Sequence, residues 1–268
     1  GRLQFSHAVV KNEIKINDPV PLSILGKPHP TSLEFYLDDV YRLKAVRHEQ
    51  HGYDESSSKI RGRKFYRHHK AINEQEVLNN AQTNQNRSVV GIYRADSTWQ
   101  FTIRFENLQP VELGSLLWTL QLKEGKQQGY HRIGYGKPLG FGSVQIDVIG
   151  LEFLDIQARY ERAQSSPLDG LASQGKWVDR FRGAMCRLYQ CENFAELNNI
   201  VDLFALLGER SDDLVIHYPR RDPNRGAPDN EGFHWFMDNR DGDTPEHLKP
   251  AHQDDGLPYT VGKRSRRT

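Results

Sequence analysis

The sequence is poor in cysteine and has no long apolar run. Its two cysteines, Cys186 and Cys191, are too few for a disulfide-rich scaffold or a four-thiolate zinc site, so we expect ordinary reduced thiols. No segment approaches the roughly 18 apolar residues of a membrane-spanning helix, and no signal peptide is visible. These absences predict a cytoplasmic protein with no membrane partner and no cofactor in this chain.

The sequence also lacks a net charge that would indicate a partner. Among 268 residues, 36 Lys and Arg balance 35 Asp and Glu, so an electrostatic binding surface requires local clustering. This length suffices for one large domain or two modest ones. The chain begins with "GRLQFSHA", without methionine and already in a strand-like pattern, so we expect it to be part of a longer polypeptide.

Hydrophobic periodicity predicts an α+β chain. Residues 97–108 alternate apolar and polar positions like a half-buried strand. Residues 109–122 then change to the spacing of an amphipathic helix, with Pro110 in its first turn. A glycine-rich loop and a strand over 143–155 follow. Strand, helix, loop and strand in this order are typical of the second half of a ferredoxin-like (RRM-type) fold, whose first half is missing here.

The last third of the chain has helical periodicity. Apolar residues recur at helical spacing over 177–190 and again over 193–209, where an asparagine is suited to cap the helix and a glycine to end it. We interpret the aromatic residues of both segments as core. The sequence therefore predicts a ferredoxin-like part over 1–155, with proline-rich and basic insertions, and a helical region with a basic tail over 156–268.

A basic stretch, "KIRGRKFYRHHK", is the strongest local departure from neutrality. It contains six Lys and Arg, two His and two aromatic residues, with no acid. Cationic groups neutralise phosphates, and aromatic rings stack on unpaired bases. The alternative is a solvated loop whose aromatic residues pack inward. The predicted RNA-binding residues are Arg61, Arg63, Lys64, Phe65, Tyr66, Arg67, His68, His69 and Lys70.

The glycine-rich segment "RIGYGKPLGFGSV" is the second candidate binding element. It matches neither nucleotide fingerprint, because a helix precedes it, a strand follows it, and Lys137 is followed by Pro138. Glycines would let an RNA backbone approach the main chain, with Lys137 as the counter-charge. The alternative is a wide turn that holds helix against sheet. The predicted RNA-binding residues here are Gly134, Gly136, Lys137, Gly140, Phe141, Gly142 and Ser143.

No catalytic motif is evident, and the catalytic residues stay unknown. His68 and His69 offer acid–base chemistry, but adjacent residues of an extended segment point to opposite sides. Asp238, Asp241 and Asp243 resemble a fragment of a calcium loop that lacks its terminal glutamate, so an exposed turn is expected and no metal site.

Four segments together resemble the RAMP superfamily of CRISPR-associated proteins, in particular the Cas-seven-like backbone units of type III effectors and their single-chain fusions. They are "GRLQFSHA", "KIRGRKFYRHHK", "FTIRFENLQPVELGSLLWTLQL" and "GKPLGFGSV". The resemblance implies a modified RRM fold, partial in this chain, with the glycine-rich loop near the guide backbone. Members that cut target RNA use an aspartate in a loop after the first strand, and no aspartate here matches it. We therefore expect this chain to be non-catalytic by itself.

The resemblance also implies a function and its partners. A backbone unit of this kind binds guide RNA (crRNA) and helps to position complementary target RNA for RNA-guided cleavage in antiviral defence. The expected partners are guide RNA, target RNA, other RAMP units of the same effector or polypeptide, and an ancillary protein. Two alternatives stay open: a guide-processing endoribonuclease acting through His68 or His69, and a protein-interaction scaffold formed by the helical last third.

Overall fold

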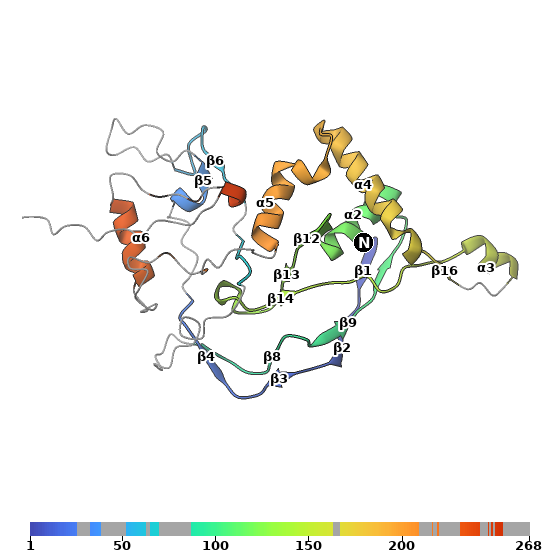
Figure 1. Cartoon of the computed structure of the whole chain (residues 1–268), viewed down its shortest axis with the longest axis horizontal. Helices are drawn as coiled ribbons and strands as arrows, with labels where there is room; N and C mark the ends of the chain where they lie inside the picture. Colours follow the sequence, from blue (N-terminus) through green and yellow to red (C-terminus); the bar gives the residue numbers. More distant parts are fainter. Residues whose placement is uncertain are drawn as a thin grey trace, which may run out of the picture. The chain divides into compact units, whose positions relative to one another are not determined.

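The chain divides into two units, each built from separate segments of the sequence (Figure 1). Unit 1 comprises Gly1–Asp18, Gly91–Ile133 and Gly142–Glu209, and unit 2 comprises Pro19–Val90, Gly134–Phe141 and Arg210–Thr268. The structure, a computed structural model, describes residues 1–25, 33–38, 52–62, 65–69, 87–162, 167–208, 216, 219, 231–241, 246, 248 and 250–253.

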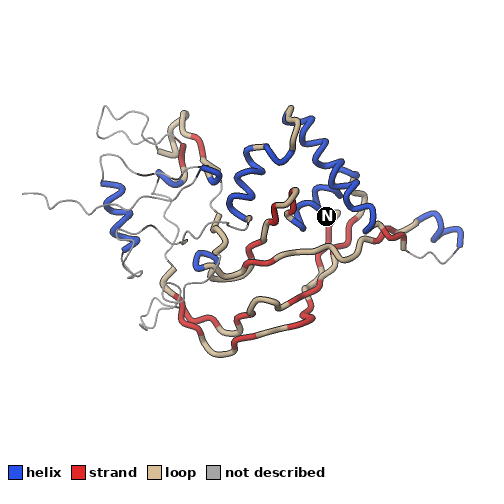
Figure 2. The backbone as a smooth tube through the Cα atoms, in the orientation of Figure 1, coloured by secondary structure: helices blue, strands red, loops and turns tan. Residues whose placement is uncertain are grey.

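The strands of unit 1 are short and pair antiparallel. They are β1 (Leu3–Phe5), β2 (Val9–Asn12), β3 (Lys15–Ile16), β8 (Ile92–Tyr93), β9 (Thr98–Gln100), β10 (Ile103–Phe105), β11 (Lys123–Glu124), β12 (Gln127–Gln128), β13 (His131–Arg132), β14 (Ser143–Val144), β15 (Glu152–Phe153) and β16 (Leu168–Asp169). β1 pairs with β10, β2 with β9 and β3 with β8, placing Leu3 opposite Phe105 and Val10 opposite Trp99. Loops separate these successive pairs (Figure 2). β11 pairs with β12, β13 with β14 and β15 with β16.

The helices of unit 1 lie in its second and third segments. They are α2 (Pro110–Gln121), α3 (Ile156–Arg162), α4 (Gln174–Tyr189) and α5 (Asn198–Leu207), with the 3-10 turns η3 (Leu171–Ser173) and η4 (Phe194–Glu196). α2 begins with Pro110 and a capping box, in which the Glu112 carboxylate accepts the Gln109 backbone N–H at 2.7 Å. The helix is capped at its C-terminal end by Leu122, which has a left-handed backbone. The Leu122 N–H donates a hydrogen bond to the Trp118 carbonyl.

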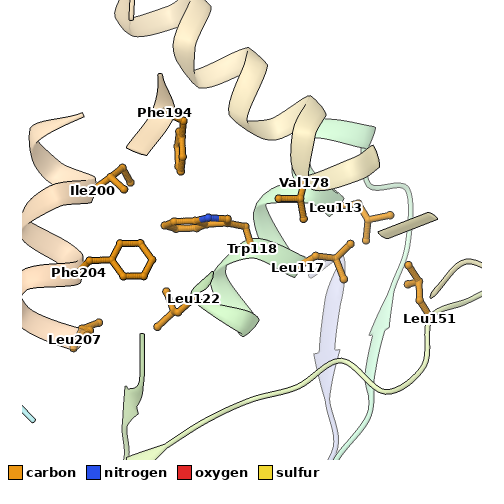
Figure 3. Close-up of a cluster of buried hydrophobic side chains, with 10 residues drawn as sticks. All are labelled: Leu113, Leu117, Trp118, Leu122, Leu151, Val178, Phe194, Ile200, Phe204 and Leu207. Atoms are coloured by element: carbon orange, nitrogen blue, oxygen red, sulfur yellow. The ribbon is translucent and has the colours of Figure 1, made fainter. Parts of the chain in front are cut away.

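Trp118 is central to the hydrophobic core of unit 1 (Figure 3). Its ring centroid lies 5.2 Å from that of Phe194 and 5.8 Å from that of Phe181, and Phe204 approaches edge-on at 6.3 Å. Such tilted and edge-to-face pairs add to the stabilisation from burial. The buried cluster comprises Leu113, Leu117, Trp118, Leu122, Leu151, Val178, Phe194, Ile200, Phe204 and Leu207.

A glycine allows α2 and α4 to cross closely. A Cβ added to Gly114 would overlap the Trp177 carbonyl oxygen, and would lie 2.6 Å from its carbon and 3.0 Å from the Phe181 Cβ. Carbon atoms in contact are normally about 3.5–4.0 Å apart. The absence of a side chain at this position therefore sets the distance between the two helices.

The Glu124 carboxylate accepts hydrogen bonds from two side chains beside this core. The Glu124 carboxylate oxygen Oε2 accepts the Trp118 indole N–H at 2.9 Å and the Arg182 Nε–H at 3.0 Å. The Glu124 side chain is 12% exposed and that of Arg182 is 28% exposed. Because both charged groups are largely withdrawn from water, each depends on the other to offset its lost hydration.

The structure confirms the α+β class, but it divides the chain differently from the expected boundary at residue 155. α2 and α4 lie on opposite sides of that boundary, yet Leu113 and Leu117 of one helix share a buried cluster with Val178 of the other. This shared burial unites the two helices in unit 1, while Pro19–Val90 belongs to unit 2.

The expected strand over 143–155 is broken. Only Ser143–Val144 and Glu152–Phe153 pair with partner strands in the described structure, and the segment between them alternates in exposure without joining a ladder. The apolar alternation between these strands therefore does not form a ladder, because among the described residues no neighbouring strand supplies backbone hydrogen bonds to it.

The expected helix over 193–209 begins later than its cap. Asn193 accepts the Ala195 N–H at 3.1 Å, but it caps η4 rather than α5. Leu197 has an extended backbone and separates the two elements, and Gly208 ends α5 as expected. Leu188, which follows the apolar spacing of α4, is 67% exposed.

Unit 2 has a smaller core. Its elements are β4 (Val20–Leu22), η1 (Leu33–Phe35), β5 (Leu37–Asp38), β6 (Lys59–Ile60), β7 (Arg87–Val89), η2 (Lys137–Leu139), α6 (Glu231–Asp241) and η5 (Ala251–Gln253). β4 pairs with β7 and β5 with β6.

The predicted exposed turn at Asp238 and Asp241 is wrong, because both residues lie in helix α6. Asp243, the third residue of that prediction, lies outside the described residues.

None of the helices in the described ranges combines the length and apolarity needed to cross a bilayer.

Candidate nucleic-acid interface

The glycine-rich segment forms a tight turn around η2. The N–H groups of Leu139 and Phe141 both donate to the Gly136 carbonyl, at 2.9 and 3.3 Å. Gly136 (φ 74°) and Gly140 (φ 94°) bracket the turn in the left-handed region, which side chains disfavour. Residues 134–141 belong to unit 2, and Gly142 and Ser143 belong to unit 1.

The small core of unit 2 anchors this turn. Leu139 is 7% exposed and packs with Leu22, which is 1% exposed. Val20 and Val89 of the β4–β7 pair and Phe141 of the turn pack around them. The turn is therefore fixed to a strand pair, and Lys137 lies half-buried at its start.

Contacts within the chain account for three of the four glycines. A Cβ on Gly142 would overlap the Ile133 carbonyl oxygen across the hairpin, and one on Gly136 would lie 3.0 Å from the Phe141 ring. A Cβ on Gly140 would lie 2.9 Å from the His69 Cγ. Gly134 alone of the four has no atom of the described structure within 4 Å of such a Cβ. The wide-turn interpretation thus explains most of the glycine content.

The contact between Gly140 and His69 joins the two segments that the sequence indicated separately. His69 closes the described part of the basic stretch, and its ring lies against the α-carbon of the glycine turn. Tertiary structure therefore brings a histidine of the basic stretch beside the turn that carries Lys137. Sequence spacing could not reveal this, because about seventy residues separate the two segments.

The basic stretch is only partly a regular element. It begins as β6, which pairs with β5, and the Arg61 N–H donates to the Tyr36 carbonyl at 3.0 Å. The Arg67 guanidinium donates to the Ala251 carbonyl at 2.9 Å. This contact with η5, from the far end of the sequence, was not predicted, and no sequence signal indicated it. One charge of the stretch thus serves a structural contact.

The remaining predicted residues differ in accessibility. Phe65 is 44% exposed, and Tyr66 and His69 are half-buried. His68 is 6% exposed, so its ring offers little surface to a ligand. Ser143 is exposed on β14. Arg63, Lys64 and Lys70 lie outside the described residues.

The described residues of this candidate site carry positive charge but form no metal-ligand cluster. Within the described ranges, no group of three or more His, Cys, Asp or Glu side chains is placed to hold a metal ion. Lys137 and Arg61 are cations of the kind that attract phosphate, and the exposed Phe65 ring is of the kind that stacks on bases. Neither the family models nor the curated proteins searched contain a match to this chain.

Proposed function

We propose that the chain binds single-stranded RNA through the glycine turn and basic stretch of unit 2. In this proposal it acts as a backbone unit of an RNA-guided CRISPR effector, holding guide RNA and positioning target RNA for cleavage. The observation that supports it is the contact between His69 and Gly140, because it joins a cationic, aromatic segment to a backbone turn. Lys and Arg side chains and backbone N–H groups are both sources of phosphate contacts in nucleic-acid complexes.

The proposed fold of unit 1 is the second half of a modified ferredoxin-like domain. β10, α2 and the β13–β14 hairpin follow one another in the order that such a half requires. The buried face of α2 and the antiparallel pairing of β10 with β1 are compatible with it. A further strand pairing beside β1 would complete the proposed sheet.

Burial argues against the guide-processing alternative. An acid–base pair must reach the ribose hydroxyl and the leaving oxygen. His68 is 6% exposed, and the His69 ring packs on Gly140. We therefore propose binding without catalysis, with cleavage carried out elsewhere in the effector.

The salt dependence of RNA binding tests this proposal. Replacing Lys137 with alanine should weaken binding of a labelled single-stranded RNA and reduce the slope of log K against log salt by about 0.7, the value for one lost phosphate contact. Lys126→Ala is the matched control, because Lys126 is an exposed lysine in the β11–β12 turn of unit 1. It should leave the slope unchanged.

The result that would overturn the proposal is equally direct. Binding that does not respond to salt, or equal slopes for Lys137→Ala and Lys126→Ala, would remove unit 2 as the RNA-binding surface. The nucleic acid that copurifies with the intact protein from cells carrying its CRISPR array gives an independent test of the effector role. Short RNAs of uniform length with a repeat-derived end would support it, and a protein free of RNA would contradict it.

A further inference from the structure

Cys186 and Cys191 meet at the end of α4. Gln190 has a left-handed backbone (φ 53°, ψ 44°), which turns the chain back on the last turn of the helix. As a result, the Cys186 carbonyl accepts the N–H of Gln190 and also the N–H of Cys191, the latter at 3.0 Å. The second bond is that of a Schellman motif, which a contact between the side chains of the two bonded residues frequently accompanies.

The same turn brings the two α-carbons within range of a disulfide. A backbone N lies about 1.5 Å from its Cα and a carbonyl O about 2.4 Å from its own, so a hydrogen bond of 3.0 Å limits the Cα–Cα distance to at most about 6.9 Å. That limit applies to a straight line of atoms, and the bent turn makes the distance shorter. Disulfides usually span about 4.4–6.8 Å between α-carbons.

The two thiols already interact in the reduced protein. A hydrogen bond with the Cys191 side chain, together with burial, raises the pKa of Cys186. Both residues are free thiols and partly exposed, so a small oxidant can reach them. Cys186 also packs against the hydrophobic core of unit 1, which holds its side chain in place.

We propose that Cys186 and Cys191 form a reversible disulfide that closes the corner between α4 and η4. The oxidant is a small disulfide such as glutathione disulfide. One thiolate attacks it and releases one glutathione thiolate, leaving a mixed disulfide on the protein. The second cysteine then loses its proton and attacks the protein sulfur, releasing the second glutathione. Two protein thiols lose two electrons and two protons, and glutathione disulfide gains them.

Either cysteine can make the first attack on glutathione disulfide, and the other then attacks the mixed disulfide. The closed corner leads within three residues to Phe194, whose ring packs edge-on against Trp118. Oxidation therefore fixes the chain where it enters the core.

Redox titration of the full chain tests the proposal. The protein is equilibrated with mixtures of reduced and oxidised glutathione, quenched with an alkylating agent, and analysed by peptide mass spectrometry. We expect an intramolecular disulfide between the two residues, and an effective thiol concentration at least tenfold higher in the folded chain than in urea. The thermal unfolding midpoint should rise when the wild-type chain is oxidised. Cys191→Ser should show no such rise.

Two outcomes would overturn the proposal. One is separate glutathionylation of the two cysteines in the folded chain without an intramolecular bond. The other is an effective concentration in the folded chain equal to or below that in urea, which would mean that the turn does not favour the disulfide. The second comparison uses wild-type protein alone, so it holds even if Cys191→Ser fails to fold.

Discussion

Replacing Gly114 with alanine tests whether the contact between α2 and α4 holds unit 1 together. In an exposed helix this substitution stabilises by about 0.5–1 kcal/mol, because alanine loses less conformational freedom on folding. At Gly114 the new Cβ would lie 2.6 Å from the Trp177 carbonyl carbon. The helices would have to separate by about 1 Å to restore normal contact.

That separation would weaken the packing of the whole core. Leu117 (2% exposed) and Val178 (8% exposed) lie in the buried cluster that α2 and α4 share, and the Trp118 and Phe181 rings are 5.8 Å apart. A radial gap of this size forfeits a quarter to a half of each dispersion contact, and overpacking typically costs about 1–3 kcal/mol, occasionally more. After the gain from alanine is subtracted, we expect a net destabilisation of about 1–2 kcal/mol, equivalent to a fall in Tm of about 2–8 °C.

Thermal unfolding followed by far-ultraviolet circular dichroism measures this effect. The matched control is Gly183→Ala, also within a helix, where an added Cβ meets only the end of the flexible Arg187 side chain at 3.5 Å. We expect that control to raise Tm slightly. If Gly114→Ala raises Tm as the control does, the close crossing of the two helices is refuted.

Two further predictions concern charged groups. Glu124→Ala should destabilise unit 1 by about 2 kcal/mol, because it removes the more buried of the two carboxylates that pair with Arg182. Asp179→Ala removes the other carboxylate, which is 72% exposed, and should change the unfolding free energy far less. Equal losses for the two variants would contradict this reasoning. The pKa of the Glu112 carboxyl is lowered from its usual value of 4.5, chiefly by its hydrogen bond with Arg2. The ionised carboxylate therefore stabilises the folded state at a pH above the unfolded pKa, and this stabilisation is lost as the pH falls through the folded pKa. The Tm difference between wild type and Glu112→Gln should therefore shrink below about pH 4.5, and a difference that does not depend on pH would count against the ion pair.

The sequence predicted elements whose signals are local. The α+β class and the helices α2 and α4 follow from apolar spacing along the chain, and Pro110 marks the start of α2 as expected. Phe194, Ile200 and Phe204 are buried as their helical spacing predicted. Such patterns depend on residues three or four positions apart, so they are visible without any tertiary information.

The same local signals misplaced several features. Leu188 follows the apolar spacing of α4, yet it is 67% exposed. Trp118 was not predicted as core, although three aromatic rings surround it. The strand expected over 143–155 is interrupted because pairing needs a partner strand, and apolar alternation does not supply one.

The candidate interface shows the same division between sequence and tertiary structure. Charge clustering and glycine content identified the basic stretch and the glycine turn from sequence alone, and their role in RNA binding stays a prediction. Only the tertiary structure placed His69 against Gly140 and joined Arg67 to Ala251. It also showed that at three of the four glycines an added Cβ would collide with, or press closely against, other atoms of the chain. Composition is a local property, whereas contacts between distant residues depend on which segments the hydrophobic cores bring together.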